Sequence, residues 1–353
     1  MKILFQILIL LVIASGLYLV LSPAPVDAIS VQVPPAQTFS GALAKNDRLQ
    51  SAEIIKLPAG KQGGEDVARD HHGCLYTGTL EGAILRRCRN KRWETLTNTG
   101  GRPLGLHFDG QQNLIIADAD KGLLRLTQDG HLSVLADTFE GKKLGVVDDV
   151  DIGADGTIYF SDASQRYPLT DIVKDILDGR PSGRLFALNP DDNTLTLLAD
   201  QLAFANGVAV ARDQHYVMIN ETFRYQIRKV WLKGEKAGQS EIITQGLPGM
   251  PDGIARAADG SYWVAMYGLR PALVDAIHDK PWLKNLLARL PKALAPVPEP
   301  YGFILQINED GEILQSFHDQ AAVAIGEVTS VQPENDGLYL GTLHMDRIAK
   351  LRF

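Results

Sequence analysis

A repeated pair of short strands constrains the fold of this chain more than any other feature. Six times, a hydrophobic strand start is followed about eight residues later by a second strand. Turn dipeptides such as Asp155-Gly156 and Asp259-Gly260 separate the paired strands and supply the positive φ of tight hairpins. A β unit that recurs at roughly forty residues, with insertions, predicts an all-β, six-bladed β-propeller. The first strands start at Val67, Leu106, Val150, Val208, Ile254 and Val331, and the second at Leu75, Leu114, Ile158, Tyr216, Tyr262 and Leu338.

The composition fits one repeat-built domain that binds no nucleic acid. A chain of 353 residues with 45% hydrophobic residues can bury a sizeable core, and propellers exceed the usual domain length without splitting. Its formal net charge is −7, whereas phosphate binding requires a clustered basic surface. We therefore expect a small-molecule substrate, with the propeller spanning residues 46–353.

The N-terminus predicts an exported protein held at a membrane. Residues 3–21 are apolar, with only Lys2 before them and no further charge until Asp27. This length favours a transmembrane signal anchor over residues 1–21, because a cleaved signal has a shorter apolar core. The alternative is secretion after cleavage near Ala28, since Val26-Asp27-Ala28 offers small residues to a signal peptidase. Both place the propeller outside the cytoplasm, in the periplasm, the extracellular space or a lumen, and residues 22–45 read as a Pro-rich stalk.

The two cysteines, Cys74 and Cys88, flank one predicted hairpin. A three-residue turn at Leu80-Glu81-Gly82 would set them opposite each other and permit a disulfide in an exported protein. A two-residue turn would place the side chains on opposite faces and leave two thiols. No partner residue completes a zinc spacing for either cysteine.

Two blades contain insertions, and one blade is short. Residues 163–181 and 269–300 connect second to third strands, which places both insertions on the face where the inner strands begin. The helical spacing of apolar residues in 281–290 predicts a lid, although a helix that only caps blade edges fits the same pattern. The last blade lacks an outer strand, which we expect residues 52–57 to supply, closing the ring.

A second periodicity indicates a metal site. The residue two places before each first strand lies at an equivalent position around the propeller axis. Carboxylate and amide oxygens there are the ligands that Ca²⁺ requires, and Glu65 has no turn preference to explain its place. We predict a calcium site built from Glu65, Asp148, Asn206 and Asp252. The six residues of this ring are Glu65, Leu104, Asp148, Asn206, Asp252 and Thr329.

A calcium-dependent hydrolase of lactones or aryl esters is the activity that this ring favours. Calcium with open positions polarises a carbonyl oxygen, and Asp252 is our candidate general base. Arg102, just before the second inner strand, is the candidate substrate-binding residue, and His107 is expected to be a packed core histidine. No Gly-x-Ser-x-Gly elbow is present. The alternative is a non-catalytic, metal-stabilised binding scaffold.

From about residue 46 onward the chain resembles a family of calcium-dependent six-bladed propellers. The family includes gluconolactonase, regucalcin, paraoxonase and strictosidine synthase, and the motifs are most similar to the adipocyte plasma membrane-associated proteins. The resemblance rests on Asn46-Asp47-Arg48-Leu49, Gly64-Glu65-Asp66-Val67-Ala68, Arg102-Pro103-Leu104-Gly105-Leu106, Ser182-Gly183-Arg184-Leu185, Ala205-Asn206-Gly207-Val208, Leu247-Pro248-Gly249-Met250-Pro251-Asp252 and Lys280-Pro281-Trp282.

The resemblance implies that Glu65, Asn206 and Asp252 occupy metal-ligand positions. Asp148 stands where relatives usually have Asn, which adds a negative charge. Strictosidine synthase uses a glutamate on its last blade, at the position that matches Thr329. A strictosidine synthase-like condensing enzyme is therefore a further alternative that this threonine argues against.

Overall fold

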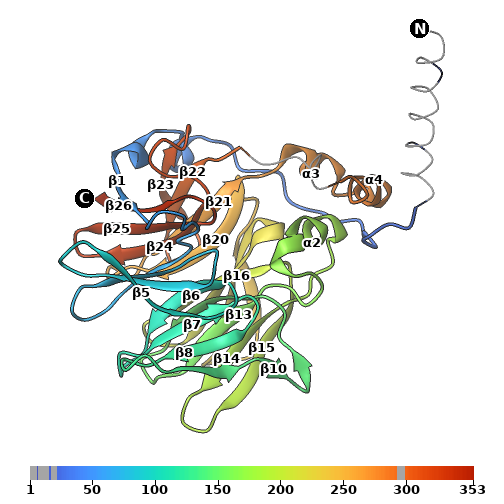
Figure 1. Ribbon diagram of the computed structural model, residues 1–353. Coiled ribbons are helices and arrows are strands. Elements are labelled where there is room, and N and C mark those ends of the chain that lie inside the picture. Colours follow the sequence, from blue (N-terminus) through green and yellow to red (C-terminus); the bar gives the residue numbers. More distant parts are fainter. Residues whose placement is uncertain (1–5, 7–15, 17–21, 292–298) are drawn as a thin grey trace.

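The computed structural model of the protein describes residues 6, 16, 22–291 and 299–353. Six four-stranded antiparallel sheets are arranged radially, which confirms the predicted six-bladed propeller (Figure 1). In blades 1 to 5 the strands follow one another in sequence from the innermost outward, and in blade 6 the outermost strand comes from the N-terminal side. The second strands begin at the predicted residues or one residue earlier, because the alternating hydrophobic pattern and the Gly-containing turns are local signals. Five of the six inner strands begin three to five residues before the predicted starts, which instead mark where regular pairing resumes after a register shift.

The strands of the six blades have the following bounds. Blade 1 contains β2 (Val67–Arg69), β3 (Leu75–Gly78), β4 (Ala83–Arg87) and β5 (Trp93–Asn98); blade 2 contains β6 (Pro103–Phe108), β7 (Leu114–Asp118), β8 (Gly122–Leu126) and β9 (Leu132–Ala136). Blade 3 contains β12 (Val147–Ile152), β13 (Ile158–Asp162), β14 (Gly183–Asn189) and β15 (Thr194–Leu202); blade 4 contains β16 (Ala205–Val210), β17 (Tyr216–Glu221), β18 (Gln226–Trp231) and β19 (Ser240–Thr244). Blade 5 contains β20 (Gly249–Arg256), β21 (Tyr262–Leu269), β22 (Gly302–Ile307) and β23 (Ile313–Asp319); blade 6 contains β24 (Val328–Glu334), β25 (Gly337–Thr342) and β26 (Arg347–Arg352). A small hairpin, β10 (Thr138–Phe139) with β11 (Lys142–Lys143), follows blade 2.

The N-terminal strand β1 (Glu53–Lys56) completes blade 6. It pairs antiparallel with β26, with Ile55 opposite Ile348, as the short last blade predicted. Two short 3-10 turns, η1 (Gly41–Leu43) and η2 (Arg48–Ser51), lead into this strand. The ring is thus closed by hydrogen bonds between the two ends of the propeller.

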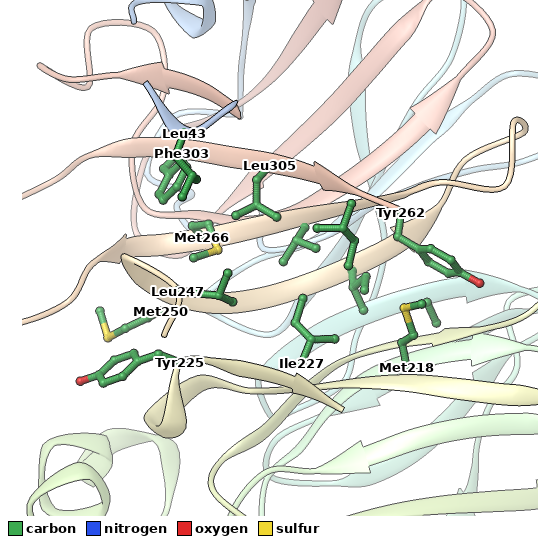
Figure 2. Close-up of a cluster of buried hydrophobic side chains, with 14 of the residues drawn as sticks. Leu43, Met218, Tyr225, Ile227, Leu247, Met250, Tyr262, Met266, Phe303 and Leu305 are labelled. Carbon is green, nitrogen blue, oxygen red and sulfur yellow. The ribbon is translucent and has the colours of Figure 1, made fainter. Parts of the chain in front are cut away.

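The hydrophobic core is divided into layers between adjacent blades. In the layer between blades 4 and 5, Met218 and Ile227 face Met266 and Leu305, with Leu43 of η1 covering one end (Figure 2). Because each layer uses one face of each of two sheets, every blade is buried on both faces except at its outer strand.

Both insertions contain helices that lie over the start of the inner strands. The first contains η3 (Leu169–Asp171) and α2 (Ile172–Asp178), and the second contains α3 (Ala272–Ile277) and α4 (Pro281–Leu287) (Figure 1). A further 3-10 turn, η4 (Thr222–Arg224), follows β17. Ile176, Leu177 and Ile277 of the lid pack in one cluster with Leu104, a ring residue, and Phe204, two residues before the ring residue Asn206. The helices therefore form a lid on the face that the topology predicted.

The disulfide alternative for the two cysteines is confirmed. Cys74 and Cys88 are bonded, and their neighbours Leu75 and Arg87 pair directly across β3 and β4. The hairpin closes through the three-residue turn Leu80-Glu81-Gly82, flanked by a hydrogen bond from Thr79 to Ala83. This turn length places both cysteines on one face.

Residues 22–37, here called the strap, run extended but are bound along the lid. The Ile29 amide donates to the Asp178 carbonyl oxygen and the Val31 amide to that of His278, each over 2.9 Å. Val26, Ala28 and Val31 are buried. The strap, which is the first part of the segment expected to be a stalk, is therefore bound to the propeller. It does not act as an extended spacer.

The predicted anchor over residues 1–21 lies outside the described residues, apart from positions 6 and 16. Within the part of the chain that the structure describes, every helix is too short or too polar to cross a bilayer.

Candidate metal centre

Irregularities in the inner strands present the ring residues to the axis. In β12, β16, β20 and β24 the pairing register shifts around the ring residue. In β12, for example, the shift lies between Val147, just before Asp148, and Val150, and the other three strands shift at the equivalent place. Two residues per strand, such as Asp148-Asp149 and Asn206-Gly207, fall within the bulge and leave the ladder. Bulges of this kind re-aim side chains, which explains why residues of equivalent sequence phase meet in space.

Glycines follow three of the ring residues, Leu104, Asn206 and Asp252, because neighbouring inner strands approach closely there. A Cβ on Gly207 would lie 2.3 Å from the Asp252 carbonyl oxygen, and one on Gly253 would lie 2.6 Å from that of Thr329. Larger residues at these positions would push the blades apart at the site.

Three carboxylates of the predicted ring converge on one point. Glu65, Asp148 and Asp252 are buried, and each offers an oxygen within 4.8 Å of the others. Asn206, also buried, hydrogen-bonds through its side chain to Asp252. The structure thus brings together all four residues that the sequence selected.

The electrostatics of this cluster disfavour three negative charges without a cation. Burial, followed by the charges of Asp252 and Asp148, raises the pKa of Glu65 well above its ordinary value, while Arg102 opposes this shift. Burial and Asp148 likewise raise the pKa of Asp252, and burial raises the pKa of Asp148 to about 7. Like charges in a desolvated site hold protons unless a cation replaces them.

The remaining ring positions serve the structure rather than the cluster. The Thr329 hydroxyl is buried and donates to the Glu65 carbonyl oxygen over 2.6 Å, fixing the backbone of a cluster residue. Leu104 packs in the lid cluster. The ring therefore divides into four residues with carboxylate or amide side chains at the centre, and two others, Thr329, which binds the Glu65 backbone, and Leu104, which packs under the lid.

Residues of the neighbouring strand β17 and its following turn hold Asp252 in place. The Asn220 side-chain amide donates to the Asp252 carbonyl oxygen over 2.5 Å, and the Thr222 hydroxyl donates to that of Pro251 over 2.7 Å. The Asn220 Oδ1 atom is buried and has no hydrogen-bond partner within the described ranges. Asn220 Oδ1 is therefore a buried hydrogen-bond acceptor without a partner, in a side chain that contacts the Asp252 backbone.

Arg102 lies next to the cluster and is engaged by the protein. Its guanidinium is buried and donates to the carbonyl oxygens of Gly63 (3.0 Å) and Leu343 (3.2 Å). Burial lowers the pKa of Arg102, and the charges of Glu65 and Asp148 partly restore it. Arg102 therefore feels the charges of Glu65 and Asp148 in the cluster. Its contact with a substrate stays a prediction.

Below the cluster, a central channel contains further carboxylates that the sequence did not single out. It encloses a cavity of about 220 Å³ lined by inner strands, including Asp66, Asp149 and Asp151. Asp66 Oδ2 accepts the Leu106 amide and Asp149 Oδ2 the Val208 amide, at 2.8 and 2.7 Å. These carboxylates join neighbouring blades, and the signal that could have found them is their position one residue after the ring.

The prediction of a packed core role for His107 is wrong. His107 lines the channel, is partly exposed, and lies with Nδ1 3.5 Å from Asp151 Oδ1. The register shift in β6 lies between Pro103 and Leu106, so His107 stands in the regular pairing opposite Ile115. Because β6 is the innermost strand of its blade, the face opposite Leu106 borders the channel at this position instead of a packed layer.

At the rim of the lid-bearing face, Glu327 and His344 form a pair that sequence reasoning left unassigned. Glu327 Oε2 lies 3.0 Å from His344 Nδ1, and Glu327 adopts a φ of 50°. Burial, followed by the charges of Glu327 and Asp252, raises the pKa of Tyr267, so this tyrosine stands near both carboxylates.

Comparisons with known proteins agree with this architecture. The family model described as Strictosidine synthase matches residues 148–235, and the model described as Strictosidine synthase-like, N-terminal, matches residues 41–87. Among solved structures, a gluconolactonase from Xanthomonas campestris superposes with a TM-score of 0.62 at 18% identity, covering 94% of this chain and 99% of that one. The calcium-binding protein regucalcin from Agrobacterium tumefaciens gives a TM-score of 0.56 at 14% identity, over 84% and 97% of the two chains.

Two full-length relatives extend the likeness across nearly the whole chain. The adipocyte plasma membrane-associated protein of Salmo salar is 29% identical over 95% of this chain and 85% of its own. The protein STRICTOSIDINE SYNTHASE-LIKE 6 of Arabidopsis thaliana is 34% identical over 81% of this chain and 78% of its own. With this identity and coverage, and with the propeller and its motifs in place, the chain belongs to the strictosidine synthase-like family.

Proposed function

We propose that the protein is a calcium-dependent hydrolase of lactones or aryl esters. The observation that carries this proposal is the convergence of Glu65, Asp148 and Asp252, buried, with oxygens within 4.8 Å of one another. The lactonase class is supported by the gluconolactonase fold likeness, which concerns architecture alone.

The donor set suits a hard divalent cation. Three carboxylates and the amide oxygen of Asn206 are ligands that Ca²⁺ favours, and the set contains neither His nor Cys, which zinc and copper sites favour. A bound calcium would compensate the three buried carboxylate charges, whose burial raises the pKa values of Glu65, Asp148 and Asp252, and would polarise a substrate carbonyl.

The chain's own groups supply the proton transfers. In its ionised form the Asp252 carboxylate accepts a proton from the water that attacks the ester carbon. The acyl C–O bond then breaks, and the leaving oxygen takes the proton back from Asp252. The products are a carboxylic acid and an alcohol or phenol, and Asp252 is again ionised. Asn206 hydrogen-bonds to the Asp252 carboxylate, and Asn220 and Thr222 bind the backbone around it, so the base is held in one position.

The deciding experiment is a screen of the full chain in detergent against lactones and aryl acetates, with and without a calcium chelator. The full chain is used because the buried strap residues would be lost from a shorter one. We expect turnover that the chelator abolishes and added calcium restores. If both substrate classes show no chelator-sensitive turnover, the metal-stabilised binding scaffold is the better description.

A condensing activity of the strictosidine synthase type has weaker support. The position that matches the catalytic glutamate of that enzyme is Thr329, whose hydroxyl is bound to the Glu65 carbonyl oxygen. An added amine and aldehyde substrate pair tests this alternative in the same screen.

We further propose that the protein is membrane-anchored through residues 1–21, with the propeller outside the cytoplasm. The apolar run before Ser22, the disulfide and the plasma membrane-associated relatives support this location.

A further inference from the structure

The outer surface of the lid carries large apolar side chains. Each lid helix buries its inner apolar residues in the cluster beneath, among them Ile176, Ile277 and Leu283. Each helix also exposes one large apolar side chain: Val173 of α2 is 49% exposed, Leu273 of α3 is 44% exposed and Trp282 of α4 is 66% exposed. Helix α4 contacts both α2 and α3, and the exposed surface of these three neighbouring helices, which carries Val173, Leu273 and Trp282, is here called the outer lid face.

The strap fixes the start of the folded chain to this same layer. Arg289 Nε donates to the Ser22 carbonyl oxygen over 2.8 Å, just beyond the end of α4. The Ala28 amide donates to Asn285 Oδ1 over 3.1 Å, and Lys284 Nζ donates to the Ile29 carbonyl oxygen over 2.7 Å. Ser22, where the continuously described part of the chain begins, is therefore fixed at the lid.

The sequence leaves no linker between this point and the apolar run. Residues 3–21 are apolar and uncharged, and Ser22 follows directly. When such a run is inserted in a bilayer, its end lies at the membrane surface. With Ser22 bound at α4, the lid must lie at that surface too.

The chemistry of the outer lid face suits this position. Tryptophan concentrates at membrane interfaces, where its apolar ring and its N–H are both accommodated.

We propose that the outer lid face lies on the lipid bilayer, with Trp282 in the interfacial region. The proposal rests on the membrane anchor proposed above and is independent of whether the site hydrolyses a substrate. It explains why the lid helices, which bury apolar residues in the cluster beneath them, also expose Val173, Leu273 and Trp282.

The test uses the four tryptophans of the full chain, reconstituted in vesicles of phosphatidylcholine and phosphatidylglycerol with brominated acyl chains. Trp93 and Trp231 are partly buried and Trp263 is buried, whereas Trp282 is exposed. We expect the bromolipid to quench the wild-type emission, and Trp282→Phe to lose most of that quenching. The matched control Trp93→Phe, on β5 of blade 1, should keep it.

A second variant keeps the reporter and changes the surface. Leu273→Asp places a charge on the outer lid face and should reduce the quenching of Trp282 without lowering the melting temperature. Equal quenching in wild type and Trp282→Phe overturns the proposal, as does an unquenched Trp282 covered by a second copy of the chain or by a protein partner. Chain that floats free of the vesicles also overturns it, and leaves the hydrolase proposal intact because turnover is measured separately.

Discussion

At the scale of the residue, the ring positions differ in role although they share a phase. Glu65, Asp148 and Asp252 meet within 4.8 Å, whereas Thr329 binds the Glu65 backbone. Asp252 combines a position in the cluster with contacts from Asn206 and Asn220, which makes it the best-oriented candidate base. The roles of ligand and base can therefore be separated by substitution.

Asp252→Asn keeps an oxygen ligand but cannot accept a proton. We expect it to bind calcium more weakly and to lose turnover by about 10²–10⁴-fold at saturating calcium, because a general base typically contributes that much. Glu65→Gln should act mainly through metal affinity, so excess calcium restores much of its rate. Isothermal titration and rates at saturating calcium distinguish the two. Equal rescue of both variants would make Asp252 a ligand only.

The raised pKa of Asp148 predicts how the free energy of unfolding of the calcium-free protein depends on pH. Burial raises the pKa of Asp148 in the folded state to about 7, above the 3.8 of an ordinary Asp. Between these values the unfolded chain has released the proton that the folded protein holds, so stability falls as pH rises from about 4 to about 7. In chelator, Asp148→Asn should remove part of this fall and stabilise the protein at pH 8 by on the order of 1 kcal/mol or more.

Urea unfolding of the chelated full chain from pH 5 to pH 8 measures this effect. The control is Asp200→Asn, an exposed aspartate on β15, which should leave the pH profile unchanged. A wild-type stability that rises across this range would contradict the assignment. Added calcium should flatten the profile, because it replaces the protons.

At the scale of the element, closure of the ring by β1 stabilises blade 6. The Ile55 side chain is 5% exposed and packs in the layer between blades 6 and 1, whereas the adjacent Ile54 is 41% exposed. The two residues share a strand and a side-chain type, and each lies opposite its own residue of β26, Ala349 for Ile54 and Ile348 for Ile55. They differ only in the face to which the strand directs them.

Ile55→Ala should destabilise the protein by about 2–5 kcal/mol, since it leaves a cavity in a packed layer. Ile54→Ala should change stability by less than about 0.5 kcal/mol. Chemical denaturation of both variants measures the difference. Equal effects would mean that β1 contributes backbone pairing alone.

At the scale of the whole molecule, the disulfide reports on where the propeller resides. Cys74 and Cys88 are the only cysteines and are bonded to each other. Disulfides persist in oxidising compartments, so an exported propeller keeps this bond. The strap also binds the N-terminal side of the chain to the lid, so the membrane anchor that we propose would set the orientation of the propeller.

Thiol labelling of denatured protein from freshly lysed cells should show no reactive cysteine until a reductant is added. Mature protein recovered from membranes should retain the residues before Ser22. Two thiols that react without reduction would contradict the exported location. A mature chain that begins at Ile29 would contradict the anchor but not the export.

The sequence by itself determined the number of blades, the residues at which regular pairing of the inner strands begins, the closing strand, and the four ring members with carboxylate or amide side chains. These features follow from periodicity, turn residues and phase, which are local properties of the chain. The lid position also followed, because the direction of antiparallel strands decides on which face a connection emerges.

Only the tertiary structure decided how those parts are used. The strand bulges turned Asp148, Asn206 and Asp252 toward one point, and a register shift depends on the pairing partner rather than on the strand's own residues. The position of the innermost strand β6 placed His107 at the channel. The inter-blade contacts of Asp66 and Asp149 and the binding of the strap to the lid likewise join segments far apart in the chain. Local patterns carry no information about such contacts, because they exist only once the blades have closed into a ring.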